Sequence, residues 1–387
     1  MGSTLVTPLW GLFQYRFGFS EITLTLIYAT YVVGNLVALL FFGRISDRLG
    51  RRKVALPALL IAILGALSFL FARSDAWLYA GRLLIGVAVG LASGTGTAWL
   101  AELYGATRQG PATVSATVGN QVGIAVGPLI AGILAQYAPY PLQLPFVAYI
   151  AVLVAAAAAI MAWPPETVAS PVALAAASLR PRIGVPPSIR WQFVAPMLTA
   201  FAIFSLTGFY YALLPNVLRE ALGNGNVAIT GAIVFEMIGT TIAVLLIGRN
   251  LPSRVAMFSA LLLILPSAAL LVLTQSLHSM AILLCAGLFT GASLALGYRG
   301  SLQVVNEIAP HDRRAEVVSS YLLACFAGNA IPVIGVALVA ARTTLLTASL
   351  AFSCALAVLS LLALGAHRRY GMTSAAVTNR PACANRS

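Results

Sequence analysis

The stretch GRISDRLGRRK, residues 43–53, places five basic side chains between two long uncharged segments. Residues 22–42 before it and residues 54–71 after it contain no Asp, Glu, Lys or Arg. An α-helix rises about 1.5 Å per residue, so roughly 20 apolar residues cross the ~30 Å hydrocarbon core of a bilayer. The stretch therefore predicts a short basic loop between two membrane-spanning helices.

The rest of the chain repeats this pattern. Of 387 residues, 60% are hydrophobic and 9% are charged, whereas soluble domains contain roughly 25% charged residues. A water-soluble fold could not cover so much apolar surface, so the sequence predicts an all-α polytopic membrane protein. We expect twelve spans in two sets of six, at residues 5–17, 22–42, 54–71, 77–103, 112–137, 146–163, 193–218, 227–247, 255–273, 280–308, 317–341 and 344–364.

These spans predict two six-helix bundles. The N-terminal bundle covers residues 1–163 and the C-terminal bundle covers residues 192–366, with a central loop at 164–191 and a tail at 367–387. The first span is an exception, because its 13 residues form only ~20 Å of helix. We expect that the native chain begins upstream of Met1, so that this span is truncated at its N-terminus here.

The basic residues predict the orientation. Seventeen of the 23 Lys and Arg residues fall in alternate loops on one side, four fall on the other side, and Arg82 and Arg299 lie inside spans. Because basic loops stay in the cytoplasm, the rich side, the central loop and the C-terminus are expected to be cytoplasmic. The net charge of +13 is then explained by topology, and we expect no nucleic-acid partner.

Corresponding positions in the two sets of spans indicate an internal duplication. Gly43-Arg44 after the second span matches Gly248-Arg249 after the eighth, at a separation of 205 residues. Pro128 in the fifth span matches Pro332 in the eleventh, at a separation of 204 residues. Repeated bundles of this kind are typical of secondary transporters.

The loop at residues 43–53 resembles the signature of the major facilitator superfamily. That signature has a Gly, an acidic residue four positions later, then a basic residue, a Gly and two more basic residues; the matching positions are Gly43, Asp47, Arg48, Gly50, Arg51 and Arg52. The resemblance implies the major facilitator fold around a central cavity, and a gating role for Asp47, Arg48 and Arg51. The alternative is a basic loop that only retains the cytoplasmic side.

A second resemblance concerns Arg82 in the fourth span. The surrounding LYAGRLLIGVAVG is similar to a family motif whose intramembrane Arg is linked to proton or substrate coupling. A charge at this depth costs about 2.5 to 3.5 kcal/mol on insertion scales, so a partner or a wet cavity is expected. The alternative is an Arg that extends to the outer surface.

The fifth span resembles the motif of the drug:proton antiporter branch. The matching residues are Gly119, Gly123, Gly127, Pro128 and Gly132, whereas Val114 and Ala131 replace two of the motif's glycines. The resemblance implies export. A packing surface for a neighbouring helix is the alternative, because glycines four residues apart form a smooth groove.

Glu236 is the only acidic residue deep inside a predicted span. Burial of a carboxyl away from water favours its protonated form, so we expect Glu236 to carry a proton, with Arg299 as its partner or as a separate anion contact. A purely structural ion pair is the alternative. Further candidates for the substrate cavity are polar or aromatic residues on central helices: Tyr28, Tyr31, Asn35, Asn120, Gln121, Phe204, Tyr210, Tyr211 and Asn329.

Motifs for other energy sources are absent from the sequence. The sole lysine, Lys53, follows Arg52 rather than Gly, so there is no P-loop for ATP. The three histidines lie in predicted loops or the tail, where they form no metal-binding pattern. We expect no cofactor and no metal.

Together these features predict a secondary active transporter rather than an enzyme. We expect proton-coupled export of small amphipathic molecules by alternating access, with a small-molecule substrate, protons and lipid as partners, in a monomer. Proton-coupled uptake of a polar metabolite is the alternative, and a membrane-embedded enzyme is a more distant one. One lysine against 22 arginines indicates GC-rich DNA, so a bacterial inner (plasma) membrane is the expected location.

Overall fold

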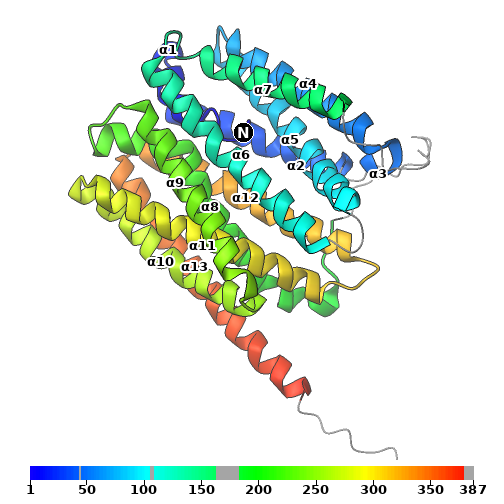
Figure 1. The fold of residues 1–387 in the computed structure, drawn as a ribbon. Helices are drawn as coiled ribbons and strands as arrows, with labels where there is room; N and C mark the ends of the chain where they lie inside the picture. Colours follow the sequence, from blue (N-terminus) through cyan, green and yellow to red (C-terminus); the bar gives the residue numbers. More distant parts are fainter. Residues whose placement is uncertain (43–44, 105–108, 163–182, 379–387) are drawn as a thin grey trace, which may run out of the picture.

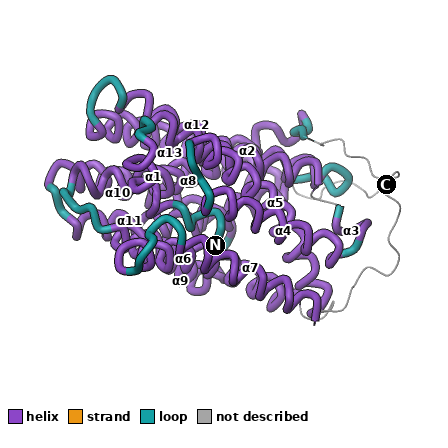
Figure 2. Tube along the Cα trace, turned by 90° about the horizontal axis from the view of Figure 1, so that it is seen from above, coloured by secondary structure: helices purple, strands orange, loops and turns teal. Residues whose placement is uncertain are grey.

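A computed structural model describes residues 1–42, 45–104, 109–162 and 183–378, without the side chains of residues 47–48, 109–114 and 367–378. Within these ranges every regular element is a helix (Figure 2). The predicted all-α class is confirmed.

The helices follow the predicted spans closely. The first half contains η1 (Thr7–Leu9), α1 (Trp10–Phe17), α2 (Glu21–Phe42), α3 (Ser46–Leu49), α4 (Arg51–Leu70), α5 (Asp75–Tyr104), α6 (Gln109–Tyr137) and α7 (Leu144–Ala162). The second half contains η4 (Pro187–Ile189), α8 (Arg190–Asn216), η5 (Val217–Ala221), α9 (Val227–Ile247), η6 (Gly248–Asn250), α10 (Ser253–Leu277), α11 (Met280–Ile308), α12 (Arg314–Ala340) and α13 (Leu345–Thr378).

Among the described residues, 11 helices are long and apolar enough to cross a membrane. The predicted span at residues 5–17 is not one of them, because it consists of η1 and the eight-residue α1. At the other end of the chain, α13 continues to Thr378, so the predicted tail starts as a helix. Figure 1 shows this part of α13 extending beyond the other helices.

The two halves form separate groups of helices that meet along two seams. Figure 1 shows α2, α4, α5, α6 and α7 above α8 to α11 and α13. The main contacts between the halves are α6 with α9 and α2 with α12. Glycines permit the first of these contacts: a Cβ on Gly231 would collide with the carbonyl oxygen of Pro128, and a Cβ on Gly132 would lie 2.9 Å from that of Val227.

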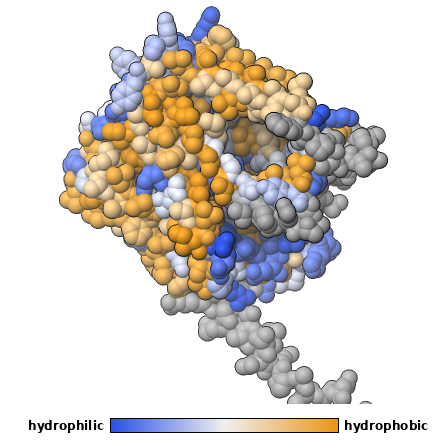
Figure 3. Space-filling model, in the orientation of Figure 1, coloured by the Kyte–Doolittle hydropathy of each residue, from blue (hydrophilic) through white to orange (hydrophobic). Residues whose placement is uncertain are grey.

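Consecutive long helices run in opposite directions, so their connections gather at two ends of the molecule (Figure 1). We call them the α1 end, with connections at residues 18–20, 71–74, 138–143, 222–226, 278–279 and 341–344, and the α3 end, with α3 and connections at 248–252 and 309–313. Figure 3 shows a largely hydrophobic surface between more hydrophilic ends. Large apolar side chains such as Leu60, Ile247 and Leu361 are exposed, as expected for a protein whose sides face lipid.

Candidate functional site

Arg82 lies at the centre of a buried aromatic cluster. Its side chain has an exposed fraction of 0%, and its Nη1 donates a hydrogen bond of 2.9 Å to the carbonyl oxygen of Ser3. The guanidinium carbon lies 4.9 Å from the ring centroid of Trp10, 5.4 Å from that of Tyr28 and 5.3 Å from that of Tyr31. The alternative in which Arg82 reaches the outer surface is therefore wrong.

The guanidinium has no acidic partner among the described residues. Its Nε and Nη2 are buried and have no hydrogen-bond acceptor there. Three aromatic faces replace part of the lost hydration, since a desolvated cation over such a face gains about 2 kcal/mol. The cluster is thus a positive charge held inside the protein with hydrogen-bonding capacity left over.

A polar contact joins this cluster to the second half. The hydroxyl of Tyr28 on α2 donates a hydrogen bond to Oδ1 of Asn329 on α12, and Nδ2 of Asn35 donates to the hydroxyl of Tyr31 at 3.4 Å. The sequence selected all four of these residues, and the structure brings them together beside Arg82. Trp10 was missed, because an apolar position in an incomplete-looking span carries no signal of its own.

Of the other cavity candidates, Tyr211 lies close enough to Tyr28 and Tyr31 to interact with them electrostatically. Asn120 is exposed and Gln121 is half-buried on α6. Phe204 on α8 packs edge-on against Tyr298, with ring centroids 5.8 Å apart. Tyr211 is half-buried on α8, and Tyr210 beside it is fully buried close to Thr290 and Glu236.

Glu236 lies near the middle of α9 and faces α11. Both of its carboxylate oxygens are buried, and neither has a hydrogen-bond partner within the part of the chain that the structure describes. The space for this carboxyl group comes from Gly287 on α11, because a Cβ on that glycine would lie 2.5 Å from Oε2 of Glu236. An unpaired ionised carboxylate would be very costly there, so the site suits a group that binds a proton.

Arg299 does not pair with Glu236. Its guanidinium donates hydrogen bonds to the carbonyl oxygen of Gly248, to that of Arg249 at 2.5 Å and to that of Leu251 at 2.9 Å. These carbonyls lie just beyond the end of α9, and that of Gly248 also accepts from the backbone N–H of Leu251. The predicted Glu236–Arg299 pair is therefore wrong, and Arg299 caps a helix at the α3 end.

The repeat explains why the two buried charges sit on different helices. Arg82 and Gly287 are 205 residues apart, the same separation that relates Gly43 to Gly248. The next glycines along these helices, Gly86 and Gly291, both press against backbone carbonyls of the neighbouring helix, those of Tyr31 and Met237. In the first half the large charged side chain is Arg82 on α5. In the second half the equivalent position on α11 is Gly287, which has no side chain, and the charged residue is Glu236 on α9.

This arrangement predicts different effects for two similar substitutions. Gly287→Ala meets only the end of the flexible Glu236 side chain, whereas Gly291→Ala meets the carbonyl oxygen of Met237. We expect Gly287→Ala to unfold at the wild-type temperature and to shift the pH profile of transport, because the carboxyl group must move. Gly291→Ala should lower the free energy of unfolding by about 1 to 3 kcal/mol, the usual effect of overpacking. Thermal unfolding in detergent and transport rates against pH would show both, and equal loss of stability in the two variants would contradict this assignment.

The signature loop forms a clamp within the first half. Arg51 on α4 is 5% exposed; its Nη1 donates to Oγ of Ser46 at 2.7 Å, and its Nη2 and Nε donate to the two carboxylate oxygens of Glu102 at 2.5 and 3.2 Å. Gly50 before it has φ +105°, a conformation that favours glycine. Gly43 and the side chains of Asp47 and Arg48 lie outside the described residues, so their predicted gating contacts stay a prediction.

Glu102 was not selected from the sequence, although the repeat contains a signal. Its equivalent 205 residues later is Glu307, which accepts a hydrogen bond of 2.9 Å from Oγ of Ser253 at the start of α10. Both acidic side chains therefore connect the end of one long helix to the start of an earlier one at the α3 end.

We expect Arg51→Lys to weaken this clamp, because an ammonium group cannot make two parallel bonds to one carboxylate. The free energy of unfolding should fall by about 1 kcal/mol, measured by thermal unfolding in detergent. Arg313→Lys is the matched control, since Arg313 also binds both oxygens of its partner Glu316 but is 43% exposed; it should change little. Equal effects of the two substitutions would show that the clamp adds nothing to stability.

The glycines of α6 serve two contacts. Gly123 and Gly127 face Met1, and Gly132 faces Val227 of α9. A Cβ on Gly119 would meet no atom within 4 Å. Gly132 and Pro128 thus support the packing alternative for this motif, whereas Gly119 leaves open space.

Comparison with known proteins agrees with this architecture. A sequence profile described as Major Facilitator Superfamily matches residues 1–333. The solved structure of the peptide transporter POT in complex with sulfate superimposes with a TM-score of 0.77 over 96% of this chain and 92% of that chain, at 14% sequence identity, which shows the fold alone.

Curated relatives match over shorter stretches. Solute carrier family 2, facilitated glucose transporter member 10 of Mus musculus is 33% identical over 111 residues, 29% of this chain and 21% of the relative. The bacillibactin exporter of Bacillus subtilis (strain 168) is 27% identical over 147 residues, 35% of this chain and 36% of the relative. The chain thus aligns with about a fifth to a third of the length of these relatives.

The helices, the lipid-facing surface and the buried charges define a multi-pass membrane protein of the transporter class. The chain belongs to the Major Facilitator Superfamily.

Proposed function

We propose that this protein is a proton-coupled exporter of small amphipathic molecules that works by alternating access. The observation that carries the proposal is Glu236, whose two carboxylate oxygens are enclosed between α9 and α11 without a hydrogen-bond partner among the described residues. A carboxyl group in this position binds a proton readily and releases it when the surroundings become wet. Glu236 is then the proton carrier.

The Arg82 cluster is the second part of the proposal. It lies beside the seam between the halves and contacts the second half through the Tyr28–Asn329 hydrogen bond. A rearrangement of the halves therefore changes the surroundings of Arg82. A transported molecule that binds Arg82 more tightly in one arrangement than in the other would favour that arrangement. The aromatic rings around this charge suit amphipathic molecules with a flat apolar part once the halves rearrange and uncover them.

The relatives support transport without choosing its direction. The similarity to the bacillibactin exporter favours export, whereas the similarity to a facilitated glucose transporter favours uptake of a polar metabolite, which is the second candidate function. The partly matched glycine motif of α6 favours export. We further propose a bacterial inner membrane with the α3 end and the C-terminus in the cytoplasm, from the distribution of basic residues.

The test is transport in proteoliposomes that carry the purified full chain and an imposed pH gradient. With ethidium as the amphipathic probe, an antiporter moves the dye toward the acidic side and releases protons in the other direction. An uptake symporter moves substrate and protons the same way. Two results would overturn the proposal: dye movement that is equal with and without the pH gradient, or a proton flux that does not change when the dye is added.

A further inference from the structure

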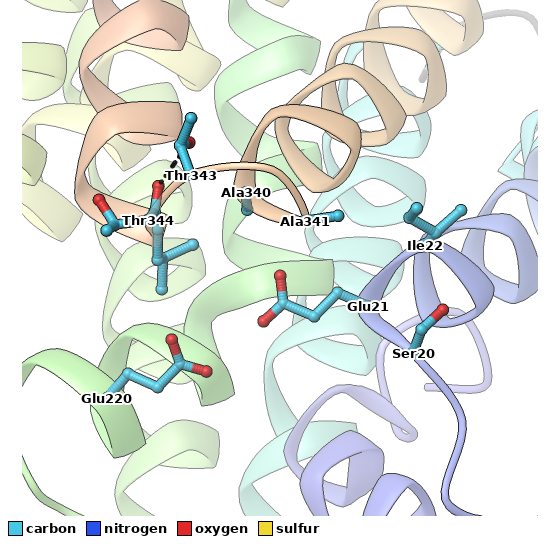
Figure 4. Close-up of a pocket in the computed structure, with 9 residues that line it drawn as sticks. Ser20, Glu21, Ile22, Glu220, Ala340, Ala341, Thr343 and Thr344 are labelled. Carbon is cyan, nitrogen blue, oxygen red and sulfur yellow. Dashed lines mark hydrogen bonds between the residues drawn. The ribbon is translucent and has the colours of Figure 1, made fainter.

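A pocket of about 450 Å³ lies between the two halves at the α1 end. The first half contributes Ser20, Glu21 and Ile22, and the second half contributes Glu220 and the connection between α12 and α13. Figure 4 shows the carboxyl groups of Glu21 and Glu220 both directed into this space, with Thr343 and Thr344 across from them. Two acidic side chains from opposite halves therefore share one pocket.

One of the lining residues, Glu21, also links the two halves directly. Nδ2 of Asn216, at the end of α8, donates a hydrogen bond of 2.8 Å to Oε1 of Glu21. Asn216 is fully buried, and its Oδ1 has no hydrogen-bond partner among the described residues. The other seam also has a hydrogen bond at the α1 end: Oε1 of Gln136 on α6 accepts a 2.9 Å hydrogen bond from the backbone N–H of Val227 on α9.

The described hydrogen bonds between the halves run from the middle of the molecule, at Tyr28 and Asn329, to this α1 end. Toward the α3 end from these contacts, an added Cβ on Gly119 of α6 or on Gly239 of α9 would meet no atom within 4 Å. The halves are thus joined at the α1 end, and alternating access requires that this end separates.

The charges around Glu21 determine whether its carboxyl group is protonated or ionised while the two halves are in contact. Glu21 is half-buried, so loss of hydration opposes its ionised form, and Glu220 on the same pocket repels that form. The Asn216 hydrogen bond and Arg219 act in the opposite direction. Arg219 is already paired with Glu220 at 3.5 Å. The α12–α13 connection contributes hydroxyl groups to the lining, and its Arg342 is not part of it. In the closed arrangement the uncharged carboxyl group is therefore favoured.

We propose that Glu21, Asn216 and Glu220 form a proton-controlled latch between the halves. Protonated Glu21 keeps its hydrogen bond to Asn216 without repulsion from Glu220, so the α1 end stays closed. Ionised Glu21 is repelled by Glu220 and gains hydration when the halves separate, so the α1 end opens. This latch acts at the end of the molecule opposite the signature loop and does not depend on Glu236.

The test is the distance between spin labels across the α1 end, measured by pulsed electron paramagnetic resonance on the full chain in nanodiscs. The labels replace Tyr15 on α1, which is 92% exposed, and Arg342 in the α12–α13 connection, after the four cysteines are changed to alanine. Between about pH 8 and pH 5 the ratio of closed to open molecules should rise by roughly tenfold, since a tenfold difference in proton affinity between two states shifts their ratio by that factor.

Three variants separate the latch from other titrating groups. Glu21→Gln keeps an oxygen that accepts from Asn216 and cannot ionise, so the α1 end should stay closed at every pH. Glu220→Gln, on a 46% exposed side chain, should make the pH response smaller without risk to folding. Glu236→Gln should keep a clear pH response, because Glu21 can still gain and lose its proton in that variant.

Several results would overturn the latch. They are a wild-type distance distribution that does not change with pH, a full response in Glu21→Gln, or a response that disappears in Glu236→Gln. None of these readings uses a transported substrate, so the latch can fail while the proposed exporter stands, and the exporter can fail while the latch stands.

Discussion

Glu236→Gln is expected to abolish uphill transport while leaving downhill movement of the same substrate. The amide has nearly the size of the carboxyl group, so it should fit the space above Gly287, where Oε2 now lies 2.5 Å from the position of an added Cβ. It cannot carry a proton, so the pH gradient loses its route into the transport cycle. We expect accumulation against a gradient to fall by roughly tenfold or more.

The measurement pairs two assays on the same proteoliposomes. Gradient-driven dye accumulation should be lost, and substrate exchange without a gradient should persist. Glu307→Gln is a matched control, because Glu307 is also acidic but lies at the α3 end, bound to Ser253. Glu236→Asp should retain part of the activity. Unchanged uphill transport in Glu236→Gln would remove Glu236 as the proton carrier.

Arg82→Met is expected to separate stability from transport. The substitution removes a fully buried cation that has one hydrogen bond, to the carbonyl oxygen of Ser3, and no acidic partner among the described residues. Because replacing buried charge by an apolar side chain of similar volume is often neutral or stabilising, the thermal unfolding temperature should stay the same or rise. Transport should fall by roughly tenfold or more, since the positive charge beside the seam is lost.

Arg299→Met provides the contrasting result. Arg299 donates to three backbone carbonyls after α9. Two of these bonds are exposed, and the Gly248 carbonyl also accepts from the N–H of Leu251, so removal of Arg299 should lower the free energy of unfolding by about 0.5 to 1.5 kcal/mol. Thermal unfolding and transport measured on both variants test the two roles together. If Arg82→Met unfolded earlier and transported normally, Arg82 would be a structural residue.

Much of the architecture was accessible from composition and spacing. Uncharged segments near 20 residues long predicted the helices, and the repeat of Gly, Arg and Pro at separations of 204 and 205 residues indicated two related halves. These signals are local or periodic along the chain, so they can be recognised without knowing which residues contact one another. The same reading selected Arg82 and Glu236, because an ionisable side chain within an apolar segment is conspicuous in any sequence.

The partners of those charges could not be predicted in this way. Arg299 was a reasonable partner for Glu236 by charge, yet its guanidinium lies at the end of α9. Trp10 and Gly287 carry no local signal, since their importance comes from what lies opposite them on another helix. Gly287 matters because it leaves room for Glu236, and an absence of side chain is visible only once the neighbouring helix is placed.

The sequence by itself therefore determined the membrane class, the helix order, the two halves and the identity of the intramembrane charges, because hydrophobic length and charge position along the chain suffice for these. Only the tertiary structure decided which groups meet. It surrounded Arg82 with aromatic rings, left Glu236 without a partner among the described residues and joined Glu21 to Asn216 across the halves. The physical reason is that the energy of a buried charge depends on the atoms within a few ångströms of it, and those atoms come from segments far apart in the sequence.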